Sequence, residues 1–126
     1  MAGQLKLEGN LVAGPSCATS DTPFPSGVDV LALGTIPSPK SYTRREHKEI
    51  EYTAVTNQAL DFVNISAQFV YLRCNVAITF RINGGTQDIP LLGTLMLEAP
   101  TATPITSITV TVGATTAQLE YYVVGF

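Results

Sequence analysis

The sequence has no tryptophan, a single histidine and few charged residues for its length. A Ser-His-Asp or Cys-His hydrolase would have to use His47, which lies in a charged segment and not beside a turn typical of a nucleophile. One histidine and two distant cysteines also cannot supply a tetrahedral zinc site. We therefore expect a protein that is not an enzyme, with no catalytic residue, no metal and no cofactor.

The two cysteines, Cys17 and Cys74, do not have the C-x-x-C spacing of a metal or redox site. One disulfide and two free thiols both stay open, and assembly in a reducing cytosol favours the thiols. The segment Met1–Lys6 has no apolar core of a signal peptide, and no apolar run is long enough to span a bilayer. The net charge of −3 argues against nucleic acid, because phosphate contacts need a basic face. We expect neither membrane nor nucleic acid as a partner.

Charge is unevenly distributed along the chain. Seven of the 17 charged residues lie between Lys40 and Glu51, and six lie between Tyr52 and Phe126. Either Thr, Ser, Asn and Gln solvate the surface of the second region, or much of that surface is buried against other subunits. We favour the second explanation and expect a homo-oligomer.

The clearest structural pattern runs from Val76 to Asp88. Apolar residues alternate with small or polar ones up to Ile82, which predicts a strand with one buried face. Asn83-Gly84-Gly85 then favours a chain reversal, and Asp88–Leu92 reads as the returning strand with Pro90 at an edge or irregular position. The sequence predicts a hairpin with a bulge or a longer loop here.

Similar short segments follow one another at even spacing, and no window of eleven or more residues keeps a helical period. The expected strands are 49–56, 60–65, 68–73, 76–82, 88–92, 94–99, 105–112 and 117–125. This pattern predicts an all-β protein, an antiparallel β-sandwich that is jelly-roll-like. An immunoglobulin-like sandwich is the alternative, although the chain lacks the tryptophan and the core cysteine pair of that fold.

Residues 1–47 differ in character from the sandwich domain expected at 48–126. Five of the eight prolines precede residue 40, and short strand-like pieces alternate with turn-forming residues. Ser41–Lys48 is polar and reads as a loop or a short helical turn. We predict an extended N-terminal arm that lies either on its own domain or on a neighbour.

The sequence offers two weak candidate sites for chemistry or ligand binding. Glu98 and Glu120 lie on separate predicted strands and could form a glycosidase pair, but two surface acids on the polar faces of strands explain them better. The adjacent Tyr121 and Tyr122 must point to opposite faces of their strand, so one is expected in the core and one outside. An exposed tyrosine could stack on a sugar, which keeps a glycan-binding module open.

The chain resembles the small structural proteins of tailed bacteriophage virions, in particular head decoration (cement) proteins and related tail-associated sandwiches. The resemblance rests on the proline-rich arm, the V-x-I-T-F-R-I-N-G-G hairpin, the T-S-I-T-V-T-V-G strand and the terminal strand ending at Phe126. It covers roughly residues 49–126 and implies a protein, often trimeric, that sits in the virion at junctions between major capsid proteins after assembly in the host cytoplasm.

If the arm clamps a neighbouring subunit, its apolar residues and the basic pair that follows are the contact candidates. They are Leu5, Leu7, Leu11, Val12, Phe24, Val28, Val30, Leu31, Arg44 and Arg45. Three alternatives stay open beside a cement protein: a receptor- or carbohydrate-binding sandwich, a tail or neck component, and a small hydrolase using Glu98 or Glu120. The sequence does not decide between head and tail, the oligomer number or the host.

Overall fold

The computed structural model describes residues 3–6, 8, 10–13, 29–32 and 40–126. These residues form strands, turns and irregular segments with no helix, which confirms the prediction of an all-β protein. The chain divides into two compact units, Gly3–Ser41 and a second that consists mainly of Tyr42–Phe126. The first unit thus ends a few residues before residue 47, where the sequence placed the end of the arm.

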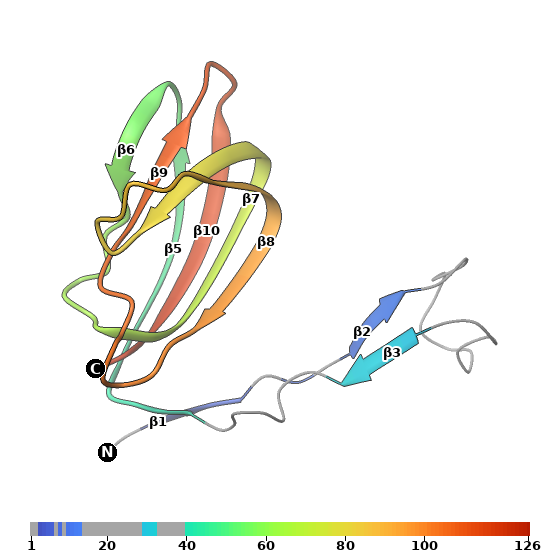
Figure 1. The fold of residues 1–126 in the computed structure, drawn as a ribbon, viewed down its shortest axis with the longest axis vertical. Coiled ribbons are helices and arrows are strands. Elements are labelled where there is room, and N and C mark those ends of the chain that lie inside the picture. The colour runs from blue at the N-terminus through green and yellow to red at the C-terminus, as the bar shows by residue number, and fades with distance from the viewer. Residues whose placement is uncertain (1–2, 7, 9, 14–28, 33–39) are drawn as a thin grey trace. The chain divides into compact units, whose positions relative to one another are not determined.

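Six antiparallel strands build the second unit (Figure 1). They are β5 (Arg44–Tyr52), β6 (Val55–Ala59), β7 (Ala67–Ile82), β8 (Ile89–Glu98), β9 (Ile108–Val112) and β10 (Ala117–Gly125). The pairing is nested: β5 pairs with β10, β6 with β9, and β7 with β8. The six strands form one curled antiparallel sheet, which confirms the prediction of an antiparallel, sandwich-like β fold.

The curled sheet has one side that contains β5 and β10 and another that contains β6 and β9. The two long strands β7 and β8 connect these two layers. The first half of β7 pairs with β10 and its second half pairs with β9, while β8 follows β7 along its length. Between Cys74 and Ile78 the register with β8 shifts, which marks a bulge in the ladder. A bulge bends a strand and increases its twist. The curled hairpin is visible in Figure 1, where β7 and β8 arch together over the other strands.

The core lies between the layers and is built from alternate residues of the strands. On β10, Leu119, Tyr121 and Val123 are buried, as the period-two pattern predicts. On the second half of β7, Ile78 and Phe80 are buried and Ile82 is partly buried against the core. The inward face of the predicted hairpin is therefore confirmed.

The number of strands differs from the prediction of eight. The expected strands 68–73 and 76–82 are both part of β7, because the bulge bends the strand without ending its pairing. The expected strands 88–92 and 94–99 are likewise one strand, β8, in which Gly93 takes a positive φ of 98°. Segment 60–65 is not a strand, although Leu60 is buried in the core from this irregular connection.

The polar segment Ser41–Lys48 is also different from the prediction of a loop or helical turn. It contains the end of β4 (Lys40–Tyr42) and the first half of β5. Extended pairing with β10 wins over the weak local preference, because each residue from Arg44 onward has a partner on that strand.

The first unit contains two short strand pairs among its described residues. β1 (Gly3–Leu5) pairs with β4, and β2 (Asn10–Ala13) pairs antiparallel with β3 (Asp29–Ala32). The strand-like pieces that the sequence suggested in the arm thus contain β1, β2 and β3, each of which is paired.

Candidate functional site

The candidate site lies on the outer face of β5, β10, β7 and β8, where outward side chains of neighbouring strands line up in rows. The register aligns four outward residues across these strands in one row, which we call the aromatic row. It consists of His47, Tyr122, Tyr71 and Met96. Tyr122 is partly exposed while Tyr121 is buried, so the predicted division of this tyrosine pair is confirmed.

A second row lies beside the first and is mostly charged. We call it the charged row, and it consists of Glu49, Glu120, Arg73 and Thr94. The carboxylates of Glu49 and Glu120 are on directly opposed residues of β5 and β10, an arrangement that destabilises a sheet unless a positive charge is close. Because both rows are on regular strands, their side chains are held at fixed spacing.

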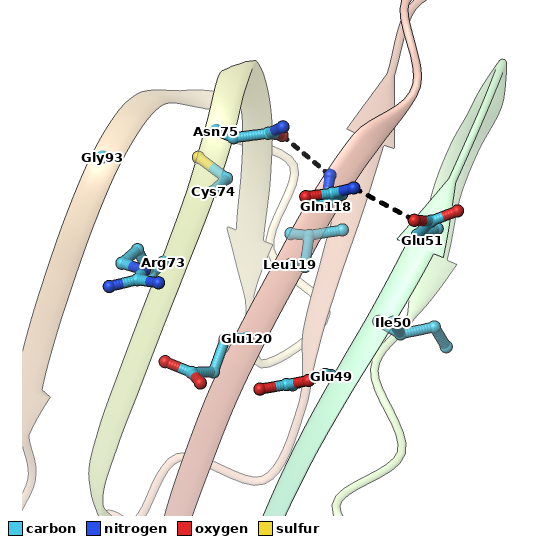
Figure 2. A pocket seen from close by; sticks show the side chains of 10 residues that line it. All are labelled: Glu49, Ile50, Glu51, Arg73, Cys74, Asn75, Gly93, Gln118, Leu119 and Glu120. Atoms are coloured by element: carbon cyan, nitrogen blue, oxygen red, sulfur yellow. Dashed lines mark hydrogen bonds between the residues drawn. The ribbon is translucent and has the colours of Figure 1, made fainter.

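An open hollow of about 700 Å³ lies on this face next to the charged row. Its lining, shown in Figure 2, comprises Glu49, Ile50, Glu51, Arg73, Cys74, Asn75, Gly93, Gln118, Leu119 and Glu120. At one end the Gln118 backbone N–H donates to Asn75 Oδ1 at 2.8 Å, and Gln118 Nε2 donates to Glu51 Oε1 at 3.1 Å. The hollow therefore offers carboxylate, amide and guanidinium groups to a ligand.

His47 joins the two rows. Its Nε2 lies 3.3 Å from Glu120 Oε2, and its ring packs edge-on against Tyr122 with 6.2 Å between the centroids. Next along β5, a hydrogen bond from the Arg45 guanidinium to Tyr122 raises the pKa of Arg45. Tyr122 thus lies next to His47 and Arg45, two outward residues of β5.

The glycosidase candidates Glu98 and Glu120 are not brought together in one row. The register places Glu98 opposite Phe69 and Glu120 opposite Arg73. Phe69 and Arg73 belong to different rows of β7, so the two glutamates are not neighbours across the sheet. The acid that faces Glu120 is instead Glu49. His47, Glu49 and Glu51 occur at every second residue, an alternation that would have placed Glu49 on the same face as His47. The polar composition of segment 41–48 instead predicted a loop or a helical turn around His47.

The outer side of β8 exposes two large apolar side chains. Leu92 is 68% exposed and Met96 is 47% exposed, both on the outward face of the strand. In the described part of the chain, β8 pairs with β7 and with no strand on its other side. The sequence did not single out these residues, because alternating apolar residues in a strand usually indicate a buried face.

The contact candidates of the arm are distributed over both units. Leu5 is a partly buried residue of β1, while Leu7, Phe24 and Val28 lie outside the described residues, as does Cys17. The register of β2 and β3 sets Leu11 opposite Leu31 and Val12 opposite Val30.

Two further candidates and the second cysteine belong to the sandwich domain. Arg44 and Arg45 begin β5 and are exposed, opposite Gly125 and Val124 of β10. Cys74 is a buried free thiol.

Comparisons with protein-family models, with curated proteins and with solved structures find no match for this chain. In the part of the chain that the structure describes, no helix is long and apolar enough to cross a membrane.

Proposed function

We propose that this protein is a non-enzymatic structural component of a virion, a decoration protein that binds across neighbouring major capsid proteins and stabilises the shell. The observation that carries the proposal is the outer side of β8, where Leu92 and Met96 are exposed beside a strand edge that is unpaired within residues 40–126. No charged residue occurs on β8 before Glu98.

Monomeric β proteins usually protect such an edge with charged residues, prolines, bulges or a covering segment. Pro90 and the bulge near Gly93 protect the first half of β8, but residues 94–97 have no such protection in their own strand. An edge of this kind can pair with an extended segment of another chain, and exposed apolar side chains beside it add buried area. This supports a protein whose partner is another protein surface.

Cementing follows from mass action. A protein that binds the assembled shell and not its separated subunits stabilises the shell by the free energy of that binding. The two-layer sandwich supplies a rigid body, and the apolar residues of the arm supply further contacts with a neighbour. We propose a homo-oligomer, with three subunits as the expected number.

The proposal is tested first on particles. Mass spectrometry of purified virions of the phage that encodes the chain should find it in stoichiometric amount, and deletion of its gene should lower the temperature at which the particles release their genome. Particles of unchanged composition and stability would contradict the proposal.

Light scattering on the full chain and on a chain that starts at Ser41 then locates the interface. A trimer that survives removal of the arm places the subunit interface on the sandwich, and a trimer that dissociates means that subunits exchange their arms. A monomer in both cases would count against the cement function.

A glycan- or receptor-binding module is the second candidate, and the aromatic row favours it. Tyr71 and Tyr122 lie in register beside a hollow that offers carboxylate, guanidinium and amide groups, a combination suited to a sugar ring and its hydroxyls. A glycan array separates the two candidates. Binding that is lost in Tyr71→Ala and kept by the chain without its arm would favour the glycan-binding module.

A further inference from the structure

Three side chains that carry possible metal-ligand atoms meet on the outer face of the β5–β10 pair. His47 and Glu49 lie two residues apart on β5 and therefore point to the same side of the sheet. Glu120 lies on β10 directly opposite Glu49, and Figure 2 shows the two glutamates on these neighbouring strands. One donor atom from each of the three side chains lies within 4.8 Å of the other two.

The spacing of two of these donors fits a tetrahedral ion. Zinc binds imidazole nitrogen and carboxylate oxygen at about 2.0–2.2 Å, so neighbouring ligands of a tetrahedral site lie about 3.3 Å apart. His47 Nε2 and Glu120 Oε2 are separated by 3.3 Å. An octahedral magnesium site would need about 2.9 Å between neighbouring oxygens. The exposed Glu49 supplies a carboxylate oxygen within 4.8 Å of each of these two donor atoms.

The local electrostatics favour a cation at this position. The like charges of Glu49 and Glu120 lie directly opposite each other on the two strands, and their repulsion destabilises the pair. A divalent ion between the two carboxylates would remove this repulsion. Although Arg73 follows Glu120 in the charged row, the ion pair of Glu120 within residues 40–126 is with His47. The positive charge needed between the two carboxylates is therefore not supplied by Arg73.

The donor types select among divalent ions. Magnesium and calcium prefer oxygen ligands, while one imidazole with carboxylates suits zinc and its first-row neighbours. The ring of Tyr122 packs against the His47 ring on the side of this cluster. Three protein ligands leave a fourth position for water or for a donor group from a bound partner.

We propose that His47, Glu49 and Glu120 form a binding site for a divalent first-row transition metal ion, best fitted by Zn²⁺, with one exchangeable position facing solvent. The site links β5 to β10 on the exposed face of the sandwich. It does not depend on whether the protein decorates a virion.

The test is calorimetric titration of the full chain, free of any purification tag, with ZnCl₂. One ion should bind per chain. His47→Gln, Glu49→Gln and Glu120→Gln should each raise the Kd at least about tenfold, as loss of groups at metal sites does. The matched control is Glu51→Gln, which changes the next outward acid of β5 and should leave the Kd within about twofold of the wild type.

Two outcomes would overturn the proposal: no binding by the wild type, or binding that the three variants weaken no more than the control. A spectroscopic readout guards against zinc bound elsewhere, for example by a cysteine. Because His47 is the only histidine in the chain, its imidazole NMR signals report on the site alone. They should shift on addition of Zn²⁺, and unmoved signals at saturation would reject the site. Circular dichroism checks that each of the four variants is folded.

Discussion

Glu49 on β5 lies directly opposite Glu120 on β10, and His47 is the ion-pair partner of Glu120 within the sandwich. The outer face therefore holds two opposed carboxylates, with a histidine side chain beside one of them. This relationship has consequences for stability as well as for metal binding.

Removing one charge of the opposed pair should stabilise the metal-free protein. In chelator near pH 8, Glu49→Gln should raise the free energy of unfolding by about 0.5 kcal/mol, because like charges across a strand pair destabilise it. Urea denaturation measures this change. Glu51→Gln is the control, since Glu51 accepts a hydrogen bond from Gln118 and faces no acid there. A loss of stability in Glu49→Gln would show that its charge is already compensated.

The buried Tyr121 hydroxyl donates a hydrogen bond to the Asp61 carbonyl oxygen at 3.0 Å, from β10 to the irregular connection after β6. Tyr121→Phe leaves that carbonyl without its partner and should lower the free energy of unfolding by about 1 kcal/mol. Tyr122→Phe, on the partly exposed side of the same strand, should cost less in the same urea experiment. Equal effects would mean that the buried bond contributes little.

Acid should weaken the attachment of the same connection. A hydrogen bond from Lys48, together with one from the Val63 backbone N–H, holds the pKa of Asp61 below its ordinary value of 3.8. A carboxyl whose pKa is lower in the folded state stabilises the fold above the unfolded pKa and loses that effect as the pH falls through the folded pKa. The melting temperature should therefore drop below about pH 4, and Asp61→Asn should flatten this decline. A variant with an unchanged pH profile would assign the decline to other acids.

The last residue of β10, Gly125, packs closely against the backbone of Ser66 and Ala67. A Cβ at Gly125 would lie 2.0 Å from the Ser66 carbonyl oxygen, so the backbone of one of the two segments would have to move. Gly125→Ala should cost about 1–3 kcal/mol of unfolding free energy. Gly113→Ala is a matched control, because its Cβ would meet no atom within 4 Å. Similar melting temperatures for the two variants would show that the backbone near Gly125 moves at little cost in free energy.

Leu92 and Leu72 separate partner binding from stability. Leu72 is fully buried, and Leu72→Ala should cost about 2–5 kcal/mol. Leu92 is 68% exposed, so Leu92→Ala should leave the melting temperature nearly unchanged while it weakens association with capsids or with other copies. Binding to particles by sedimentation measures the second effect. A Leu92→Ala protein that binds as well as the wild type would remove β8 from the interface.

The sequence by itself determined the class of fold and much of the core. The alternation in residues 76–82 and 117–125 set which side chains of β7 and β10 face inward, because a strand turns each successive side chain to the opposite face. The absence of any helical period excluded helical layers. The division of Tyr121 and Tyr122 between core and surface followed from the same rule.

The tertiary structure alone decided the number of strands and the composition of the outer face. The sequence predicted 68–73 and 76–82 as separate strands, because local residues could not show that pairing continues through a bulge. A ladder depends on residues far away in the sequence. The polar segment around His47 became strand through its pairing with β10. That pairing places His47, Glu49 and Glu120 together, since register between residues about 70 positions apart is fixed by packing of the whole sandwich and not by any local preference.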